Sequence, residues 1–233
     1  MKLNGFVGKG SGKLGSSVFA ISGGEQIVRE YNPRVANPNT DAQVEQRAKL
    51  KLMSQLAAAL AQGLAFKRMG LVSARNQFVA KNIGLCGFSD DKASMNLLNL
   101  KLTNGNAPFN NVEITTEDGN YVNVSSINPF EDGTKKVVIV FCELSENDKI
   151  LVRKVVVSDV EDGEFSATCN IGNGKTAITY VYGWKPTNSN TYVNYADYEA
   201  IASNAQASLE AIIKEMLQNG VFSDTIAQKD VLS

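Results

Sequence analysis

The second half of the chain contains a series of short segments with strand-like patterns, and turn-forming dipeptides separate them. Alternating or continuously apolar side chains predict seven strands, at residues 96–102, 112–116, 121–125, 135–142, 149–157, 164–170 and 176–184. The Asp-Gly and Asn-Gly pairs between several of them favour tight hairpin turns. Short strands with turns at regular spacing predict an antiparallel β-sandwich of immunoglobulin-like character over residues 96–186.

The segment before the β region, residues 41–95, has helical periodicity. Pro38 breaks regular structure, and Thr40 stands three residues before Gln43, which is the spacing of a capping box, so a long helix is expected to begin at Asp41. Its apolar residues recur every three or four positions and form one stripe, at Val44, Ala48, Leu52, Leu56, Ala59, Leu60, Gly63 and Leu64. The stripe either packs in the chain's own core or meets a helix of another chain. A second helix is expected over residues 71–82.

The two ends of the chain differ in character. Residues 1–40 are rich in glycine and predict a basic, flexible arm with a β-hairpin, whose strands are 17–21 and 26–31. Residues 187–233 predict a linker and a last helix over 195–219, followed by a short, partly mobile tail. The chain is therefore expected to be an α+β protein. An isolated hairpin is marginally stable in water, so this one needs the rest of the fold or another subunit.

The residue types disfavour an enzyme. Histidine is absent, which removes the side chain that most often acts as general acid or base and as metal ligand. The three cysteines are far apart and show no CxxC spacing, so neither a metal site nor a disulfide framework is expected. Gly10, Gly12 and Gly15 have the GxGxxG spacing, but no adequate strand precedes them. No catalytic residue, cofactor, metal or small-molecule substrate is predicted, and no apolar stretch is long enough to span a membrane.

Charge and aromatic side chains suggest contacts with macromolecules. Residues 1–81 hold 12 Lys and Arg against 4 Asp and Glu, whereas residues 82–233 hold 11 against 20. A basic segment on an acidic body favours contact with phosphate or with the acidic surface of a neighbouring copy. The basic residues of the arm alternate with aromatic ones that could stack on bases. A group of aromatic residues either packs in the core or stacks on sugars, at Tyr180, Tyr182, Trp184, Tyr192, Tyr195 and Tyr198.

Two N-terminal motifs carry a resemblance. Ser11-Gly12-Lys13-Leu14-Gly15 and the run Asn37-Pro38-Asn39-Thr40-Asp41-Ala42-Gln43-Val44-Glu45-Gln46-Arg47 resemble a family of uncharacterised proteins from Bacteroidetes and their crAss-like phages. The resemblance covers roughly the first 60 residues and is only architectural over the β region. It implies an immunoglobulin-like domain and a role in a virion or its assembly, and it supplies no catalytic residues.

The leading hypothesis is a phage structural or assembly protein, either a capsid accessory protein or a portal-proximal neck or tail component. It would be made in the host cytoplasm, reside in the virion, and contact other virion proteins and copies of itself. The predicted assembly contacts are Phe6, Phe19, Tyr31, Arg34, Arg47, Leu52 and Leu56. One alternative is a nucleic-acid-associated packaging protein that uses the basic N-terminal third. Another is a carbohydrate-binding adhesive module that uses the aromatic group.

Overall fold

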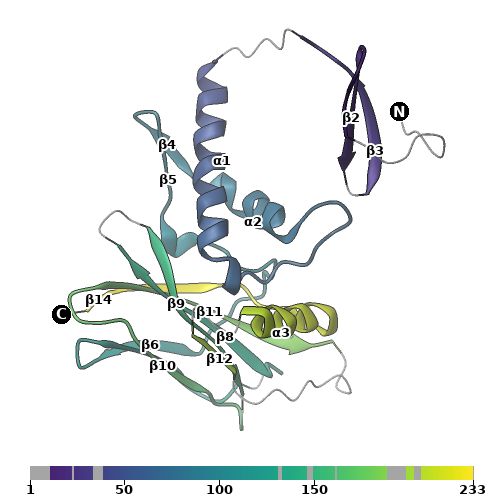
Figure 1. The fold of residues 1–233 in the computed structure, drawn as a ribbon. Coiled ribbons are helices and arrows are strands. Elements are labelled where there is room, and N and C mark those ends of the chain that lie inside the picture. Colours follow the sequence, from purple (N-terminus) through teal and green to yellow (C-terminus); the bar gives the residue numbers. More distant parts are fainter. Residues whose placement is uncertain are drawn as a thin grey trace. The chain divides into compact units, whose positions relative to one another are not determined.

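The protein divides into two compact units. The computed structural model describes residues 11–22, 24–33, 39–130, 133–145, 149–160, 162–187, 198–201 and 206–232. One unit comprises residues 1–43 and the other, which we call the body, comprises residues 44–233 (Figure 1). Helices and antiparallel sheets occur together, so the predicted α+β class is confirmed.

The first unit contains a three-stranded antiparallel sheet, which we call the hairpin sheet. Strands β2 (Ser17–Ser22) and β3 (Glu25–Glu30) form the predicted hairpin. A further strand, β1 (Gly12–Leu14), pairs with β2, so this part of the arm is ordered where the sequence predicted flexibility. Gly15 has a φ of 57° in the turn between β1 and β2, a conformation that glycine adopts without strain.

A large antiparallel sheet forms the centre of the body. Its strand order is β12-β9-β8-β11, and β13 and β14 both pair with the other side of β11. The strands are β8 (Lys136–Leu144), β9 (Ile150–Asp159), β11 (Thr176–Pro186), β12 (Tyr198–Ile201), β13 (Gly220–Phe222) and β14 (Ile226–Val231). A smaller sheet has the order β10-β7-β6, with β6 (Val112–Glu117), β7 (Tyr121–Ser126) and β10 (Ser166–Asn170).

The burial of strand β8 shows that the central sheet is covered on both faces. Its side chains are buried along almost the whole strand, as is typical of a strand between two layers. Val138, Val140 and Cys142 join one core cluster, which also contains residues of the helices. The alternate residues Val137, Ile139 and Phe141 join a second cluster with residues of the small sheet. The body therefore has three layers: helices, central sheet and small sheet.

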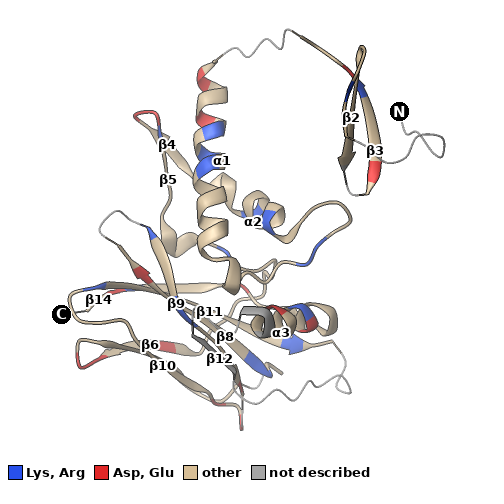
Figure 2. Cartoon of the chain, in the orientation of Figure 1, with Lys and Arg blue, Asp and Glu red and all other residues tan. Residues whose placement is uncertain are grey.

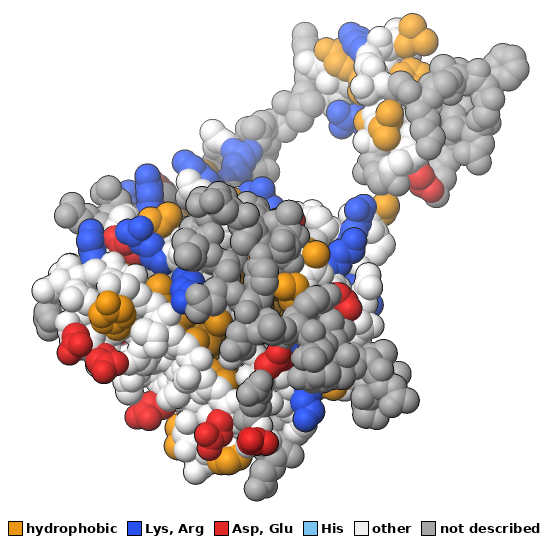
Figure 3. Space-filling view, turned by 60° about the horizontal axis from the view of Figure 1, so that its bottom comes forward, with side chains coloured by type: hydrophobic (Ala, Val, Ile, Leu, Met, Phe, Trp, Pro, Cys, Tyr) orange, Lys and Arg blue, Asp and Glu red, His pale blue; other side chains and the backbone are white. Residues whose placement is uncertain are grey.

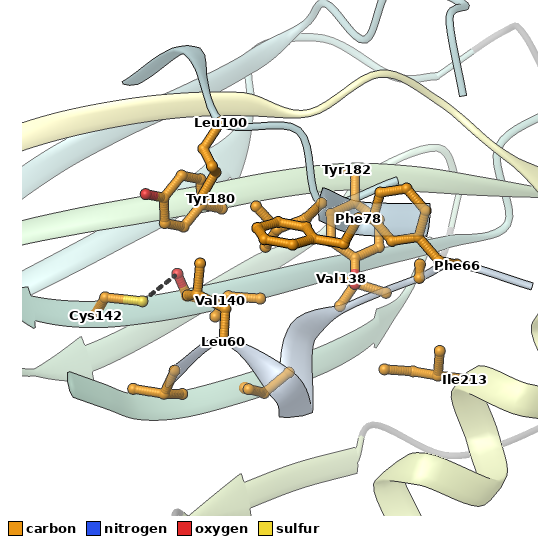
Figure 4. Close-up of a cluster of buried hydrophobic side chains, with 14 of the residues drawn as sticks. Leu60, Phe66, Phe78, Leu100, Val138, Val140, Cys142, Tyr180, Tyr182 and Ile213 are labelled. Atoms are coloured by element: carbon orange, nitrogen blue, oxygen red, sulfur yellow. Dashed lines mark hydrogen bonds between the residues drawn. The ribbon is translucent and has the colours of Figure 1, made fainter. Parts of the chain in front are cut away.

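The helical layer lies on one face of the central sheet. It contains α1 (Asp41–Ala59), α2 (Ala74–Asn82), α3 (Gln206–Asn219), the short 3₁₀ turns η1 (Ala61–Gly63), η2 (Ile83–Leu85) and η3 (Leu97–Asn99), and a small hairpin of β4 (Gly87–Ser89) and β5 (Lys92–Ser94). Leu60, Phe66, Phe78 and Ile213 from this layer pack against the valines of β8 (Figure 4). Helix α1 begins at Asp41 as predicted, although Gln43 Oε1 has no hydrogen-bond partner and the capping box is not closed.

Three aromatic residues of β11 fasten the helical layer to the sheet. Tyr180, Tyr182 and Trp184 are fully buried and alternate along the strand, so they lie on the same face. The Tyr180 hydroxyl donates to the Leu97 carbonyl at 3.1 Å, and the Tyr182 hydroxyl donates to the Gly63 carbonyl at 2.9 Å. Trp184 Nε1 donates to the carbonyl of Met216 in α3 at 2.8 Å. Each ring therefore fills the core and bonds a different helical element.

Polar contacts hold the chain between β13 and β14 against residues 101–107. Lys101 Nζ and Asp224 Oδ2 form an ion pair of 2.7 Å. The Thr103 hydroxyl donates to the Ser223 carbonyl at 2.6 Å, and the backbone N–H of Leu102 donates to the Thr225 hydroxyl at 2.9 Å. The last two strands are therefore an integral part of the body.

Several boundaries differ from the prediction. Residues 96–102 do not form a strand, because Leu97–Asn99 make a 3₁₀ turn that places Leu100 and Leu102 in the core. The last helix was expected from Tyr195, but Tyr198–Ile201 pair with β9 instead, and the described helix begins at Gln206. The tail after this helix forms β13 and β14, because β11 offers it a free edge. Among the described residues, no helix is long and apolar enough to cross a membrane.

Candidate assembly surfaces

One face of the hairpin sheet carries four of its large apolar side chains, beside Gln26 and Glu30. Residues directly opposite each other in paired strands lie on the same face. Phe19 is opposite Val28, Ile21 is opposite Gln26, and Leu14 is opposite Ser17, so the apolar side chains of Leu14, Phe19, Ile21 and Val28 share one face. We call this set the apolar face of the hairpin sheet.

This sheet has no core of its own. Among the described residues 11–33, no apolar side chain is buried, and neither core cluster contains a residue from this stretch. Leu14 is 73% exposed and Ile21 is 48% exposed, whereas Phe19 and Val28 are half-buried. Within the described residues, this face is therefore only partly covered.

The opposite face of the hairpin sheet is mixed, with two basic residues beside Val18, Ala20 and Ile27. Lys13 is opposite Val18, which is opposite Arg29, so these residues share a face with Ile27. Lys13 Nζ lies 3.5 Å from the centre of the Tyr31 ring, a cation–π contact. Tyr31 thus contacts its own unit. Phe6 and Arg34 lie outside the described residues, as do Lys2 and Lys9.

The three remaining predicted assembly contacts, Arg47, Leu52 and Leu56, lie on helix α1 and differ in burial. Arg47 is exposed on the N-terminal half of the helix. Leu56 is buried in the core of the body and Leu52 packs partly against it, so for Leu56 the alternative reading, burial in the chain's own core, holds. All the buried residues of α1 lie in its C-terminal half, because only that half covers the central sheet.

Two hollows flank Leu52 and Leu56. One has a volume of about 390 Å³ and is also lined by residues 93–98, Leu144 and Ile178. The other, of about 260 Å³, is lined by Gln55, Ala59, Lys149 and Ile150 as well. The lining of the second hollow is mostly apolar, whereas that of the first is mixed and includes Ser94, Asn96 and Lys229. Neither contains a group of ionisable residues suited to catalysis.

The three members of the aromatic group whose side chains are described do not form a surface for sugars. Tyr180, Tyr182 and Trp184 are fully buried, which leaves no ring face for stacking. Burial raises the pKa of both tyrosine hydroxyls. Tyr192 and Tyr195 lie outside the described residues, and the side chain of Tyr198 is not described. Tyr180, Tyr182 and Trp184 therefore give no support to the carbohydrate-binding alternative.

The cysteines and carboxylates suggest no reactive centre in the described part of the chain. Cys86, Cys142 and Cys169 are buried free thiols, and burial raises the pKa of Cys86 and Cys142. No group of three or more Cys, Asp or Glu residues there is placed to hold a metal ion. Glu143 is buried, and its pKa is lowered because hydrogen bonds from Arg153 and Lys175 outweigh the effect of burial.

The outer surfaces of the body differ in charge. Lys and Arg residues occur on α1, on α2 and on the connection between η1 and α2, whereas Asp and Glu residues gather on the strands and turns of the small sheet (Figure 2). A view from below shows most acidic side chains along one margin of the body and most basic ones along the other (Figure 3). The exposed acidic residues of the small sheet and its turns are Glu113, Glu117, Asp118, Asp162 and Glu164.

One exposed feature was not predicted from the sequence, the turn that precedes α2. Residues 71 and 72 were expected to belong to the second helix, but α2 begins at Ala74, with Ser73 as its N-cap. The Ser73 hydroxyl accepts a hydrogen bond from the Asn76 N–H at 3.2 Å. The sequence signal for this turn was Gly70, which follows Lys67, Arg68 and Met69 and precedes Leu71 and Val72.

Comparison of the chain with protein-family models, curated proteins and solved structures found no match.

Proposed function

We propose that the protein is a structural subunit of a phage virion, a capsid accessory protein or a neck or tail component, that docks through the apolar face of its hairpin sheet. The observation that supports this proposal is a three-stranded sheet whose described apolar side chains all remain at least partly exposed. Such a sheet gains most of its stability from what it packs against.

The apolar face would contribute modestly to each contact. Full burial of one fully exposed large apolar side chain contributes about 1.5–3 kcal/mol. Because Ile21 is 48% exposed and Phe19 and Val28 are already partly buried, the four side chains together contribute at most roughly 3–6 kcal/mol before the costs of association. The matching surface belongs to another virion protein or to another copy of the chain. Repetition of a modest contact over many copies would then stabilise the assembly.

The phage origin rests on the N-terminal motifs, and the immunoglobulin-like identity of the two β-sheets rests on the six of the seven predicted strands that the structure contains. A six-stranded and a three-stranded antiparallel sheet that share a core support the sandwich. Immunoglobulin-like topology remains part of the proposal. The nucleic-acid alternative has weaker support, because one of the two basic residues described in the hairpin sheet, Lys13, lies over Tyr31.

Two isoleucines provide a matched test of the proposal. Ile21 and Ile27 lie on neighbouring strands and are 48% and 43% exposed, but they occupy opposite faces of the hairpin sheet. Ile21→Asp places a charge on the apolar face, and Ile27→Asp places the same charge on the other face. We expect Ile21→Asp to abolish incorporation into particles purified from producing cells, and Ile27→Asp to be incorporated.

The readout is the amount of each variant in purified particles relative to the wild-type protein. Circular dichroism of the purified variants checks that the body remains folded, as expected for substitutions outside both core clusters. Equal incorporation of the two variants would show that the apolar face does not mediate docking. Absence of the wild-type protein from particles would refute the virion role itself.

A further inference from the structure

The connection between η1 and α2 forms an ordered turn on the surface of the helical layer. Met69 N–H donates to the Val72 carbonyl at 3.2 Å, and Val72 N–H donates to the Met69 carbonyl at 3.0 Å. Gly70 has a φ of 57°, and Arg68 Nε donates to the Gly70 carbonyl at 3.2 Å. These bonds fix the shape of residues 67–72, which we call the Met69 turn.

The Met69 turn exposes large apolar side chains beside two cations. Met69 is 65% exposed and Leu71 is 66% exposed, and Val72, Lys67 and Arg68 are also exposed. Adjacent exposed apolar side chains commonly mark an interaction site. Lys67 and Arg68 favour a partner surface that is acidic.

The small sheet presents such a surface on its outer side. Ile114 points into the core, so Glu113 and Glu117 point outwards, and Tyr121 lies opposite Glu117 on the same side. Glu117 Oε2 accepts a hydrogen bond from Asn123 Nδ2 at 2.6 Å. Asp118, Asp162 and Glu164 add negative charge, and residues 111–130 and 162–170 contain no Lys or Arg. We call this surface the acidic face.

The two surfaces cannot meet within one molecule. The Met69 turn belongs to the helical layer, and the central sheet separates that layer from the small sheet. Complementary patches on opposite sides of one chain pair between copies, head to tail, which produces a ring or an open filament.

We infer that the Met69 turn of one copy docks on the acidic face of a second copy. The two cations face the carboxylates of Glu113 and Glu117, while Met69 and Leu71 pack around Tyr121. This inference rests on the proposed role as an assembly subunit, and it adds a contact that does not involve the hairpin sheet.

A charge exchange tests the pairing with the full-length protein. The Lys67→Glu/Arg68→Glu variant has an acidic turn and an acidic face, and the Glu113→Lys/Glu117→Lys variant has a basic turn and a basic face. We expect the wild type to form larger species at low salt and each variant alone to sediment as a monomer. An equimolar mixture of the two variants should recover the larger species, because each then offers the other its complement.

A matched control changes the same net charge elsewhere in the helical layer. Lys51 and Lys92 are exposed, so Lys51→Glu/Lys92→Glu should associate as the wild type does. Equal loss in this control would attribute the effect to overall charge and overturn the inference. A mixture of the two variants that remains monomeric would also overturn the inference and would point to another partner for the Met69 turn. Wild-type protein that stays monomeric at low salt would overturn it as well.

The two proposals can fail separately. Sedimentation of purified protein tests the pairing of the Met69 turn with the acidic face, whereas incorporation into particles tests the apolar face of the hairpin sheet. Monomeric wild-type protein that still depends on Ile21 for incorporation would overturn only the head-to-tail contact.

Discussion

Removal of the Tyr182 hydroxyl tests whether the helical layer is bonded to the sheet as described. The hydroxyl donates to the carbonyl of Gly63 at 2.9 Å, and both residues are buried. Tyr182→Phe keeps the ring and its packing but leaves that carbonyl without this donor in an apolar environment. A buried hydrogen bond of this kind contributes about 1–2 kcal/mol, so the free energy of unfolding should fall by that amount.

The effect is measurable by denaturant unfolding. The midpoint should fall while the slope of free energy against denaturant stays constant, because the surface exposed on unfolding is unchanged. In a thermal scan, the same loss corresponds to a decrease in Tm of roughly 2–8 °C for a unit of this size.

Tyr121→Phe is the matched control, because its ring is partly exposed and its hydroxyl has no hydrogen-bond partner among the described residues. This control should change the free energy of unfolding by less than about 0.5 kcal/mol. If the two variants unfold at the same midpoint, the bond to Gly63 does not stabilise the fold. A changed slope for Tyr182→Phe would instead indicate that the helical layer has separated from the sheet.

Two further predictions concern the body. Gly105→Ala should destabilise the body by about 1–3 kcal/mol, because the added methyl group would overlap the backbone oxygens of Phe222 and Ser223. Gly84→Ala is the control and should leave the stability unchanged, because the space around its new methyl group is open. Equal unfolding midpoints for the two variants would contradict the described docking of residues 220–225. The carboxyl pKa of Glu143 is lower when folded than when unfolded, so its contribution is present above the usual carboxylate range and is lost as pH falls through the folded value. Between about pH 6 and pH 3, the wild type should therefore lose more stability than Glu143→Gln in denaturant titrations, and parallel pH profiles would refute this.

The six strands predicted between residues 112 and 184 are present, since each has strong local signals. Continuous apolar character identified β8, and Asp118-Gly119, with φ values of 52° and 66°, forms the turn between β6 and β7. The strand expected around Leu100 was wrong, because leucines at every second position can also fill a core from an irregular segment. Periodicity alone does not distinguish these cases.

The strands that were missed depend on distant partners. Residues 226–231 contain Gln228, Lys229 and Asp230, and their own pattern does not predict a strand. They become β14 because β11 offers them hydrogen bonds along Thr176–Val181. Similarly, the apolar stripe of α1 does not indicate which part of the helix packs on the sheet. The sequence alone therefore could not predict that Leu56 is buried and Arg47 is exposed.

The late position of β14 has a consequence for how the protein is made. Until residues 226–231 have been synthesised and have paired with β11, most of one side of β11 lacks its neighbour, although β8, its neighbour on the other side, comes much earlier in the chain. An unpaired strand edge is where nascent chains on one messenger can pair wrongly with each other. Rapid pairing of residues 226–231 with β11 is therefore expected to protect the new chain from aggregation.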